Sequence, residues 1–270
     1  MRKIKVGIIG CGTIGTEIAK ACLDRMRNTV NLVGICDACE EKELLLRKIL
    51  KSKVLILKLD DIIKKVDLIV EAASAKMSGA ILKKAINNKK DILIMSIGGI
   101  LGHENLLKKA AKIGIKVYLP SGAICGIDGL KSASIGKIDS VTLTTRKHPS
   151  GLTGAPYLKK NDIDIWGIRK DTVIFDGNAM DAIKGFPQNV NVCALLSLAG
   201  LGAKNTRVKV VTSPAYTKNI HEVEIKGEFG HLMTKTENVP SKTNPKTSQL
   251  AVFSAIAALE GAAKTVKIGT

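Results

Sequence analysis

The stretch Ile4-Lys-Val-Gly-Ile-Ile-Gly-Cys-Gly-Thr-Ile-Gly15 decides the fold. Its first half is an apolar run rich in β-forming residues, and its three last glycines have the spacing GxGxxG. An amphipathic segment, Ile14–Arg27, follows at once and predicts a helix. A strand, a glycine-rich turn and a helix in this order are typical of the phosphate-binding turn of a dinucleotide-binding sheet.

The residues of this turn have separate tasks. Gly10 allows the tight turn, Gly12 lets the backbone approach a pyrophosphate, and Gly15 lets the helix pack closely on the strand. The first turn of the helix, which contains Thr13 and Ile14, offers free N–H groups and the positive end of the helix dipole. We therefore expect a dinucleotide cofactor to bind at Gly10, Gly12, Thr13, Ile14 and Gly15.

A carboxylate follows the second apolar run. Leu32–Cys36 ends at Asp37, which lies 22 residues after Gly15. A carboxylate about 20 residues past the last glycine accepts from the ribose hydroxyls and repels a 2′-phosphate. No arginine comes directly after Asp37, so the sequence favours NAD without excluding NADP. Cys36 and Cys39 form a CxxC here, but no second pair has zinc-site spacing, and we expect no metal.

Apolar runs and amphipathic stretches alternate through the first 120 residues. Runs that are apolar at both parities suit parallel strands covered by helices on both faces, so we expect an α/β, Rossmann-type doubly wound parallel sheet. The expected strands are Ile4–Ile9, Leu32–Cys36, Val54–Leu57, Asp67–Ala72, Asp91–Ile97 and Lys116–Leu119. The expected helices are Ile14–Arg27, Glu40–Leu50, Lys76–Asn88 and His103–Ile113.

The pattern changes after Ser121 to strands with one apolar and one polar face, which indicates a second, α+β domain on an open mixed or antiparallel sheet. We expect a first domain at 1–124, joined by an apolar C-terminal helix within 244–270, and a second domain at 125–243. The expected strands are Lys137–Lys147, Thr172–Asp176, Thr206–Thr212, Ile220–Lys226 and His231–Glu237. The expected helices are Ala179–Lys184, Pro187–Leu201 and Gln249–Ala263.

The charge balance narrows the choice of partners. Lys plus Arg exceed Asp plus Glu by 18 in the 270 residues, which raises the question of nucleic-acid binding. However, only 7 of the 42 basic residues are Arg, the lysines are scattered, and aromatic residues make up 3%. The chain therefore has few of the Arg and aromatic side chains that recognise and stack on bases. We expect small anionic ligands and no nucleic acid.

The sequence also indicates a cytoplasmic protein without a membrane partner. No apolar run approaches the ~20 residues of a membrane span, and no signal-peptide pattern follows the start. The six cysteines stand mostly in apolar runs, as small buried hydrophobes do.

A dehydrogenase needs a general base, and histidine is the usual choice. His221 shares a parity with Val223 and Ile225, so its side chain is expected on the covered face of a sheet. The pattern leaves open whether it is a satisfied core histidine or a catalytic one. Asn189, near the start of an apolar helix, either caps that helix or donates to a ligand, and the pattern alone favours capping.

Together these residues resemble the L-aspartate dehydrogenases of archaea and some bacteria. The segments FPQNVNV, NIH and NPKTS are more specific than the glycine motif. The matching stretches are Val6–Gly15, Pro120–Asp128, Thr144–Lys147, Phe186–Val192, Asn219–Glu222, Glu237–Pro240 and Asn244–Ser248.

The resemblance implies NAD(P)-dependent oxidation of L-aspartate to iminoaspartate, which yields oxaloacetate and ammonia or serves quinolinate and NAD synthesis. It also implies a homodimer and assigns substrate binding and dimerisation to 125–243. The family's active-site histidine maps onto His221, and its nicotinamide contacts map onto Ala123 and Asn189. His148 stands where a non-titrating residue is expected.

The resemblance leads to an expected mechanism. Hydride leaves Cα of aspartate for the nicotinamide, while His221 takes a proton from the amino group or from the water that attacks the imine. Lysines or Arg146 are expected to pair with the two substrate carboxylates. One alternative is a semialdehyde-type aldehyde dehydrogenase with Cys125 as nucleophile, although no Thr or Asn adjoins it. The other is a non-catalytic NAD-binding regulator, which has no need of His221.

Overall fold

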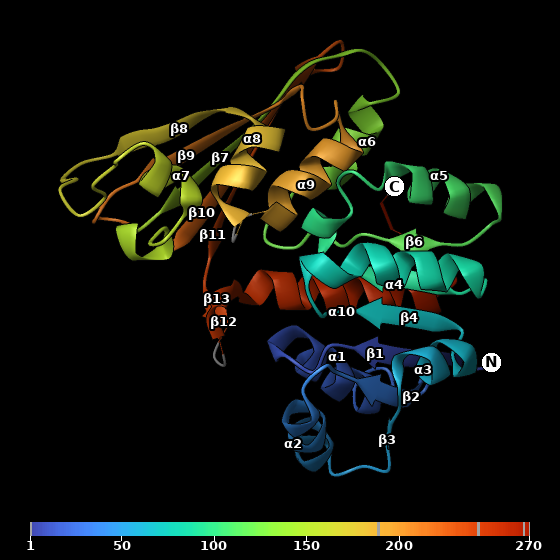
Figure 1. The fold of residues 1–270 in the computed structure, drawn as a ribbon. Coiled ribbons are helices and arrows are strands. Elements are labelled where there is room, and N and C mark those ends of the chain that lie inside the picture. Colours follow the sequence, from blue (N-terminus) through green and yellow to red (C-terminus); the bar gives the residue numbers. More distant parts are fainter. Residues whose placement is uncertain (1, 188–189, 242–243, 267, 270) are drawn as a thin grey trace. The chain divides into compact units, whose positions relative to one another are not determined.

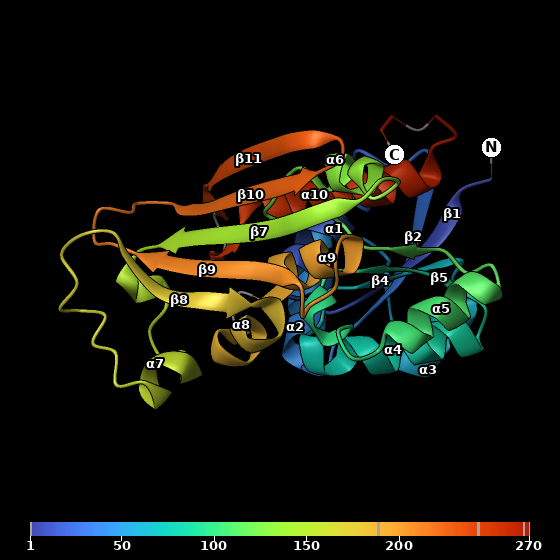
Figure 2. The same ribbon diagram turned by 90° about the horizontal axis from the view of Figure 1, so that it is seen from above.

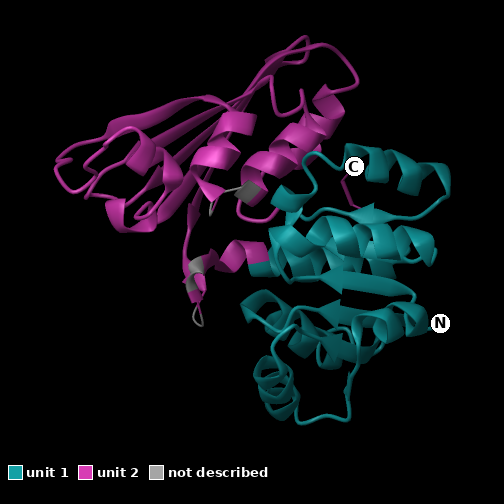
Figure 3. Cartoon of the chain, in the orientation of Figure 1, with its two compact units in different colours: residues 1–120, 252–267 teal, residues 121–251, 268–270 magenta. Residues whose placement is uncertain are grey.

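The structure is a computed structural model that describes residues 2–187, 190–241, 244–266 and 268–269. The chain forms two compact units, coloured separately in Figure 3. Unit 1 comprises residues 1–120 and 252–267, and unit 2 comprises residues 121–251 and 268–270. In the described residues, no helix has the length and apolar character needed to cross a bilayer.

Unit 1 contains the expected doubly wound sheet (Figure 1), whose described strands are all parallel and have the order β3-β2-β1-β4-β5-β6. Its order reverses between β1 and β4, and ligands of such sheets bind at that switch point. The strands are β1 (Ile4–Ile9), β2 (Val30–Cys36), β3 (Leu55–Ile56), β4 (Leu68–Glu71), β5 (Asp91–Ile94) and β6 (Val117–Tyr118). The helices are α1 (Thr13–Leu23), α2 (Glu40–Leu50), α3 (Leu59–Lys65), α4 (Ala75–Asn87) and α5 (Glu104–Lys112), with a 3-10 turn at Ile97–Gly99.

Two helices of unit 1 differ from the sequence-based prediction. α1 ends at Leu23 rather than Arg27, because the chain turns inward there and Met26 N donates to Ala21 O. This six-to-one bond closes the helix and lets Met26, only 1% exposed, enter the core. α3 was not expected, because its seven residues are too few to show a helical period; Ile62 and Ile63 are its buried residues.

The C-terminal helix α10 (Gln249–Ala263) has the predicted bounds and supplies part of the core of unit 1. Its residues Ala255 and Leu259 are fully buried in the cluster that β1, β2, β4 and α1 form. Arg25 and Glu260 join the two ends of this unit's chain by an ion pair of 3.0 Å. The residues before the helix form the short strand β13 (Asn244–Ser248), which pairs with β12 (Pro240–Ser241).

Unit 2 is built on a mixed sheet of the order β11-β10-β7-β9-β8, and Figure 2 shows these strands side by side. The β7–β9 pair is parallel, and the other pairs are antiparallel. The strands are β7 (Ile138–Lys147), β8 (Thr172–Asn178), β9 (Thr206–Thr212), β10 (Asn219–Gly227) and β11 (Gly230–Asn238). The helices are α6 (Ile127–Ala133), α7 (Pro156–Lys160), α8 (Ala179–Gly185) and α9 (Val190–Ala199).

The helix predicted at Pro187–Leu201 is observed as α9, which ends at Ala199. Gly202 has a φ of +79° and donates its N–H to Ser197 O at 3.0 Å, so a glycine in the left-handed region terminates the helix. α8 and α9 pack against the sheet on the face where alternate strand residues are buried, including Val141, Leu143 and Val223. The fold class predicted from the sequence is confirmed in both units.

Candidate active site

The glycine-rich turn of unit 1 fits a ligand in the way its spacing predicts. Gly10 has a φ of +106°, and a Cβ there would lie 2.3 Å from Ala72 O. A Cβ on Gly15 would lie 1.9 Å from Gly10 O, so the helix contacts the turn directly. Gly12 differs, because a Cβ there would meet nothing within 4 Å. The backbone at Gly12 therefore borders open space beside the N-terminus of α1, where an anion is favoured.

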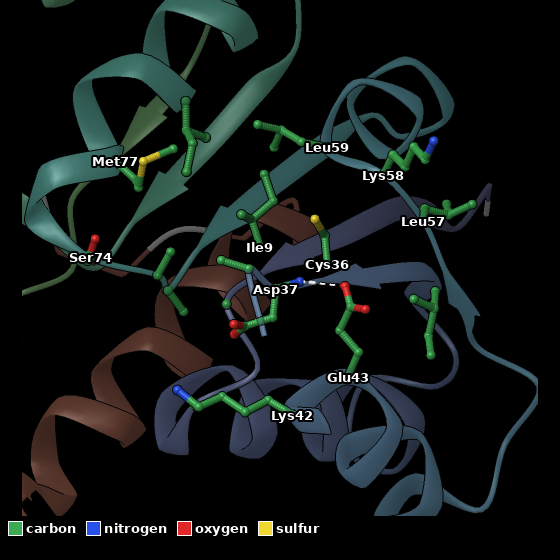
Figure 4. Close-up of a pocket in the computed structure, with 17 residues that line it drawn as sticks. Ile9, Cys36, Asp37, Lys42, Glu43, Leu57, Lys58, Leu59, Ser74 and Met77 are labelled. Atoms are coloured by element: carbon green, nitrogen blue, oxygen red, sulfur yellow. Dashed lines mark hydrogen bonds between the residues drawn. The ribbon is translucent and has the colours of Figure 1, made fainter. Parts of the chain in front are cut away.

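Asp37 is held in place by the backbone of this same turn. Its Oδ2 accepts the Cys11 N–H at 2.6 Å, and its Oδ1 accepts the Cys39 N–H at 3.0 Å. Glu43, 8% exposed, accepts the Asp37 N–H at 2.7 Å (Figure 4). A carboxylate offers about four acceptor sites, so two remain for hydroxyl donors such as those of a ribose. The carboxylate is thus oriented by the fold itself.

Gly10, Gly12 and Asp37 line one cavity of about 720 Å³. This volume lies in the range of about 300–1,000 Å³ that is usual for small-molecule sites. The walls are mostly apolar and include Leu57 and Met77, as Figure 4 shows. Thr13, Ile14 and Gly15 form the first turn of α1 next to it. The predicted phosphate-binding and ribose-binding residues are therefore together at one site.

Glu71, at the end of β4, is a functional candidate whose role sequence reasoning missed. Its side chain is fully buried, and it accepts the Ala73 N–H at 2.9 Å and the Ser96 N–H at 3.0 Å. Burial raises the pKa of this carboxyl, while the hydrogen bonds from the backbone oppose the rise. The carboxylate links the turns after β4 and β5, and Ala73 lines the cavity. No local pattern reveals a bond between residues 25 positions apart.

The cysteines near the cavity are poorly suited to thiolate chemistry. Burial, followed by the charge of Asp37, raises the pKa of Cys11 to about 12, and burial raises that of Cys36 to about 11. Cys39 donates its thiol to Glu41 at 2.8 Å. Within the described residues, no group of three or more His, Cys, Asp or Glu side chains could hold a metal ion.

His221 lies in the middle of three paired strands of unit 2. It faces Thr145 of β7 and Thr236 of β11 in the register, and it is 6% exposed. Its Nδ1 is 3.1 Å from Thr145 Oγ1. Burial, and secondly the positive charge of Lys147, lowers the pKa of His221 to about 3. The ring is therefore neutral at physiological pH, as a proton acceptor must be.

Lys147 belongs to the same face of the sheet as His221. Side chains of a strand alternate, so Lys147 follows Thr145 on the buried side. Burial lowers the pKa of its ammonium to about 8. The sequence analysis did not single out Lys147, although its shared parity with Val141 and Leu143 could have done so.

Arg146, expected as a partner of the substrate carboxylates, lies on the opposite face. Its guanidinium contacts Glu222 at 3.2 Å and donates to Tyr216 Oη at 3.2 Å. Tyr216 in turn donates to Asp171. Hydrogen bonding to Glu222 holds the pKa of Arg146 above its usual value. The charge of Arg146 is thus already engaged by this chain's own carboxylates, on the side of the sheet that does not carry His221.

Ala123, expected at the nicotinamide, has a carbonyl oxygen that accepts hydrogen bonds from two other residues of unit 2. Thr236 Oγ1 donates to it at 2.9 Å and Asn238 Nδ2 donates at 3.0 Å. Ser248 Oγ donates to Asn238 Oδ1 at 2.6 Å. The segment around Ala123 is therefore tied to β11, next to the strand that carries His221. Asn189, the other expected nicotinamide contact, lies outside the described residues.

Two of the other three histidines have local side-chain partners. His148 Nδ1 accepts the Ser150 N–H at 3.2 Å, which caps the short turn that follows. His231 contacts Glu224 at 3.1 Å. Cys125, the nucleophile of the aldehyde-dehydrogenase alternative, is exposed, and its carbonyl oxygen accepts from Thr234. In the part of the chain that the structure describes, no basic side chain is hydrogen-bonded to the Cys125 thiol.

Two family models match the chain. The model described as "Aspartate dehydrogenase, C-terminal" matches residues 128–262, and the one described as "Homoserine dehydrogenase, NAD binding domain" matches residues 10–120. The first covers β7 to β11 with His221, and the second covers the glycine turn and Asp37.

Curated relatives match over nearly the whole chain. An L-aspartate dehydrogenase of Methanococcoides burtonii is 44% identical over 99% of this chain and 100% of its own length. One of Nitrosopumilus maritimus is 39% identical over 98% of this chain and 99% of its own length.

A solved structure is similar to both units. The crystal structure of an aspartate dehydrogenase from Thermotoga maritima matches with a TM-score of 0.75 at 25% identity, covering 99% of this chain and 100% of that one. The chain also resembles, in fold alone, a scyllo-inositol dehydrogenase from Lactobacillus casei, with a TM-score of 0.56 at 18% identity over 97% and 87% of the two chains.

Proposed function

Because the chain belongs to the L-aspartate dehydrogenase family, we propose that its reaction is carried by His221 as general base, in unit 2, and by the glycine turn and Asp37 as cofactor site, in unit 1. The protein is an NAD(P)-dependent dehydrogenase that oxidises L-aspartate. The observation that carries our assignment is the hydrogen bond between His221 Nδ1 and Thr145 Oγ1, which orients the ring on the covered face of the sheet, within the residues that the aspartate dehydrogenase model matches.

The reaction breaks two bonds to hydrogen. The Cα–H bond of aspartate gives up a hydride, and the amino nitrogen gives up a proton as the C=N bond of iminoaspartate forms. NAD supplies the hydride acceptor. We assign the proton to Nε2 of His221, in the tautomer whose Nδ1–H donates to Thr145 Oγ1. That hydrogen bond fixes the ring and leaves the Nε2 lone pair free to accept the proton.

The cofactor contacts follow from the cavity of unit 1. The backbone at Gly10 and Gly12 and the first turn of α1, with Thr13, Ile14 and Gly15, cradle the pyrophosphate. The two remaining acceptor sites of Asp37 take the ribose hydroxyls. Ala123 and Asn189 remain our candidates for the nicotinamide end, on the strength of the family resemblance.

One assay tests the function as a whole. The protein is incubated with NAD and a panel of L-amino acids, and separately with oxaloacetate, ammonia and NADH, while NADH absorbance is followed. Activity confined to aspartate and oxaloacetate is expected. The variant Cys125→Ser should retain this activity, since the proposed chemistry needs no thiol. Turnover of another amino acid, or loss of activity in that variant, would contradict the proposal.

Asp37→Asn is expected to shift the cofactor preference from NAD towards NADP by about 10- to 100-fold in the ratio of kcat/KM values. The substitution removes the charge that repels a 2′-phosphate and weakens bonds to the ribose, and hydrogen bonds to charged groups have a net worth of about 1.5–3 kcal/mol. The amide oxygen of Asn can still accept the Cys11 N–H that Asp37 accepts now. Steady-state kinetics with both cofactors at saturating aspartate measure the ratio.

Lys42 provides the matched control for this prediction. It lines the same cavity, and Figure 4 shows its ammonium on the side of the Asp37 carboxylate. The added variant Lys42→Met should therefore cancel the gain in NADP use that Asp37→Asn brings. An unchanged preference in Asp37→Asn would show that Asp37 does not read the ribose.

We also propose that the protein is a cytoplasmic homodimer. Its six free cysteines, four of them buried, suit a reducing compartment. Light scattering coupled to size-exclusion chromatography tests the assembly, and a mass near the 28.8 kDa of one chain would contradict it.

A further inference from the structure

The end of β7 brings a lysine to the covered face of the unit 2 sheet, the face that carries His221. Thr145 pairs with His221 in the antiparallel register, and Lys147 is the next residue of β7 on the same face. Lys147 and His221 are therefore diagonal neighbours on adjacent strands, a position at which Cα atoms are about 7–8 Å apart. The long side chain of Lys147 can span this distance. On the other side, Lys147 pairs with Thr212 of β9, whose hydroxyl donates to Lys147 O at 2.8 Å.

The charges of this face and of the opposite face differ. Glu222 and Glu237 of the neighbouring strands belong to the opposite face, where they contact Arg146 and Lys235. The polar groups that face His221 from the adjacent strands are Thr145 and Lys147 of β7 and Thr234, Thr236 and Asn238 of β11. Among the described residues of these strands, this part of the covered face thus carries one cation beside His221, with neutral hydroxyl and amide groups around it.

We propose that Lys147 binds a carboxylate group of the substrate and so holds the dicarboxylate beside His221. The inference rests on the proposed function of His221 and adds a specificity-determining residue to it. A partly buried ammonium is a suitable partner for a carboxylate, because charge-assisted hydrogen bonds are roughly twice as strong as neutral ones. Lys147 also takes the role that the sequence analysis offered to lysines or Arg146.

Binding of the carboxylate has a consequence for the base. The charge of Lys147 is the second cause of the low pKa of His221, after burial. A substrate carboxylate on Lys147 offsets that charge, so the pKa of His221 rises when substrate is present. The base would thus become a better proton acceptor in the complex than in the free enzyme.

The test compares three variants with saturating NAD. Lys147→Met should raise the KM for L-aspartate by about 10- to 100-fold, the fold-change that the loss of one hydrogen bond to a charged group produces. Lys147→Arg keeps the charge and should restore most of the affinity. Lys209→Met is the matched control, since Lys209 of β9 pairs with Thr144 of β7 and belongs to the opposite face. L-asparagine, which keeps only the α-carboxylate, is tested as a competitive inhibitor of aspartate oxidation. Equal losses of affinity for L-aspartate and L-asparagine assign the α-carboxylate to Lys147, and a loss confined to L-aspartate assigns the β-carboxylate.

The pH dependence of ligand binding is a second measurement, and it would not change if Lys147 had only a structural role. Calorimetry with succinate, a dicarboxylate without an amino group, is carried out on the NADH-bound protein from pH 7 to 10. Because the pKa of Lys147 is about 8, wild-type affinity should fall above that pH as the ammonium loses its proton. The affinity of Lys147→Arg should stay level, since arginine keeps its charge throughout this range.

The outcomes separate the two proposals. If the wild type oxidises aspartate and Lys147→Met has the same KM and the same succinate affinity, the role of Lys147 is overturned. The role of His221 is not affected by that result. Wild type without aspartate oxidation overturns the proposed function. The succinate titration then still reports on Lys147, supporting its role if Lys147→Met binds more weakly and overturning it if binding is equal.

Discussion

His221→Ala should lower kcat for aspartate oxidation by about 10²- to 10⁴-fold, the usual contribution of a positioned acid–base group. The substitution removes the proposed proton acceptor from the covered face of the sheet. Val223 and Ile225 on the same strand remain fully buried, so the sheet keeps its apolar contacts. Steady-state kinetics over pH 6 to 9 measure the loss.

Two comparisons make this result specific. His231→Ala changes a histidine whose partner is Glu224 on the exposed part of the sheet, and it should leave kcat unchanged. NADH binding by His221→Ala, followed by fluorescence, should be close to that of wild type, because the glycine turn and Asp37 belong to unit 1 and Ala123 is held by Thr236 and Asn238 rather than by the His221 side chain. If His221→Ala turns over at a near-normal rate, His221 is a core histidine and the assignment fails.

Gly12→Ala should weaken NADH binding by about 10²-fold without lowering the melting temperature. A methyl group at Gly12 meets no protein atom within 4 Å, so the fold accepts it. It would occupy the space that the pyrophosphate needs, and the loss of a hydrogen bond to a charged group costs about 1.5–3 kcal/mol, or up to about 10²-fold in affinity. Fluorescence titration and a thermal melt measure the two quantities on one sample.

Gly15→Ala is the counterpart of this variant. Its methyl group would lie 1.9 Å from Gly10 O, so α1 must move away from the turn. The melting temperature should therefore fall, together with NADH affinity. If Gly12→Ala instead binds NADH normally, the open space at Gly12 is not the phosphate site.

The residues of the candidate cofactor site could be located in the sequence because their signals are local. The glycine spacing is read within six residues, and Asp37 follows its strand directly. Glu71 could not be assigned a role, since its hydrogen bond to Ser96 depends on how two turns meet in space. The short helix α3 was missed for a different reason, because seven residues show too little periodicity.

In the second unit, the alternation of apolar and polar residues along a strand predicted which face of the sheet a side chain occupies. This alternation predicted His221 on the covered face, and the structure has it there. The same parity separates Lys147 from Arg146, but only the register with β10 and the ion pair with Glu222 show which face each side chain uses. The choice between a core and a catalytic histidine needed the resemblance as well, because burial is common to both.

Unit 1 is formed by two segments that are far apart in the sequence, and this has a consequence for its synthesis. Ala255 and Leu259 fill its core, yet the ribosome makes them only after the 131 residues from Ser121 to Ala251. At about 5–20 residues per second, the first 120 residues wait on the order of ten seconds for the helix that completes them. During that interval the apolar side chains that α10 covers are exposed to water, so the first 120 residues are more prone to aggregate on the ribosome than in the finished chain.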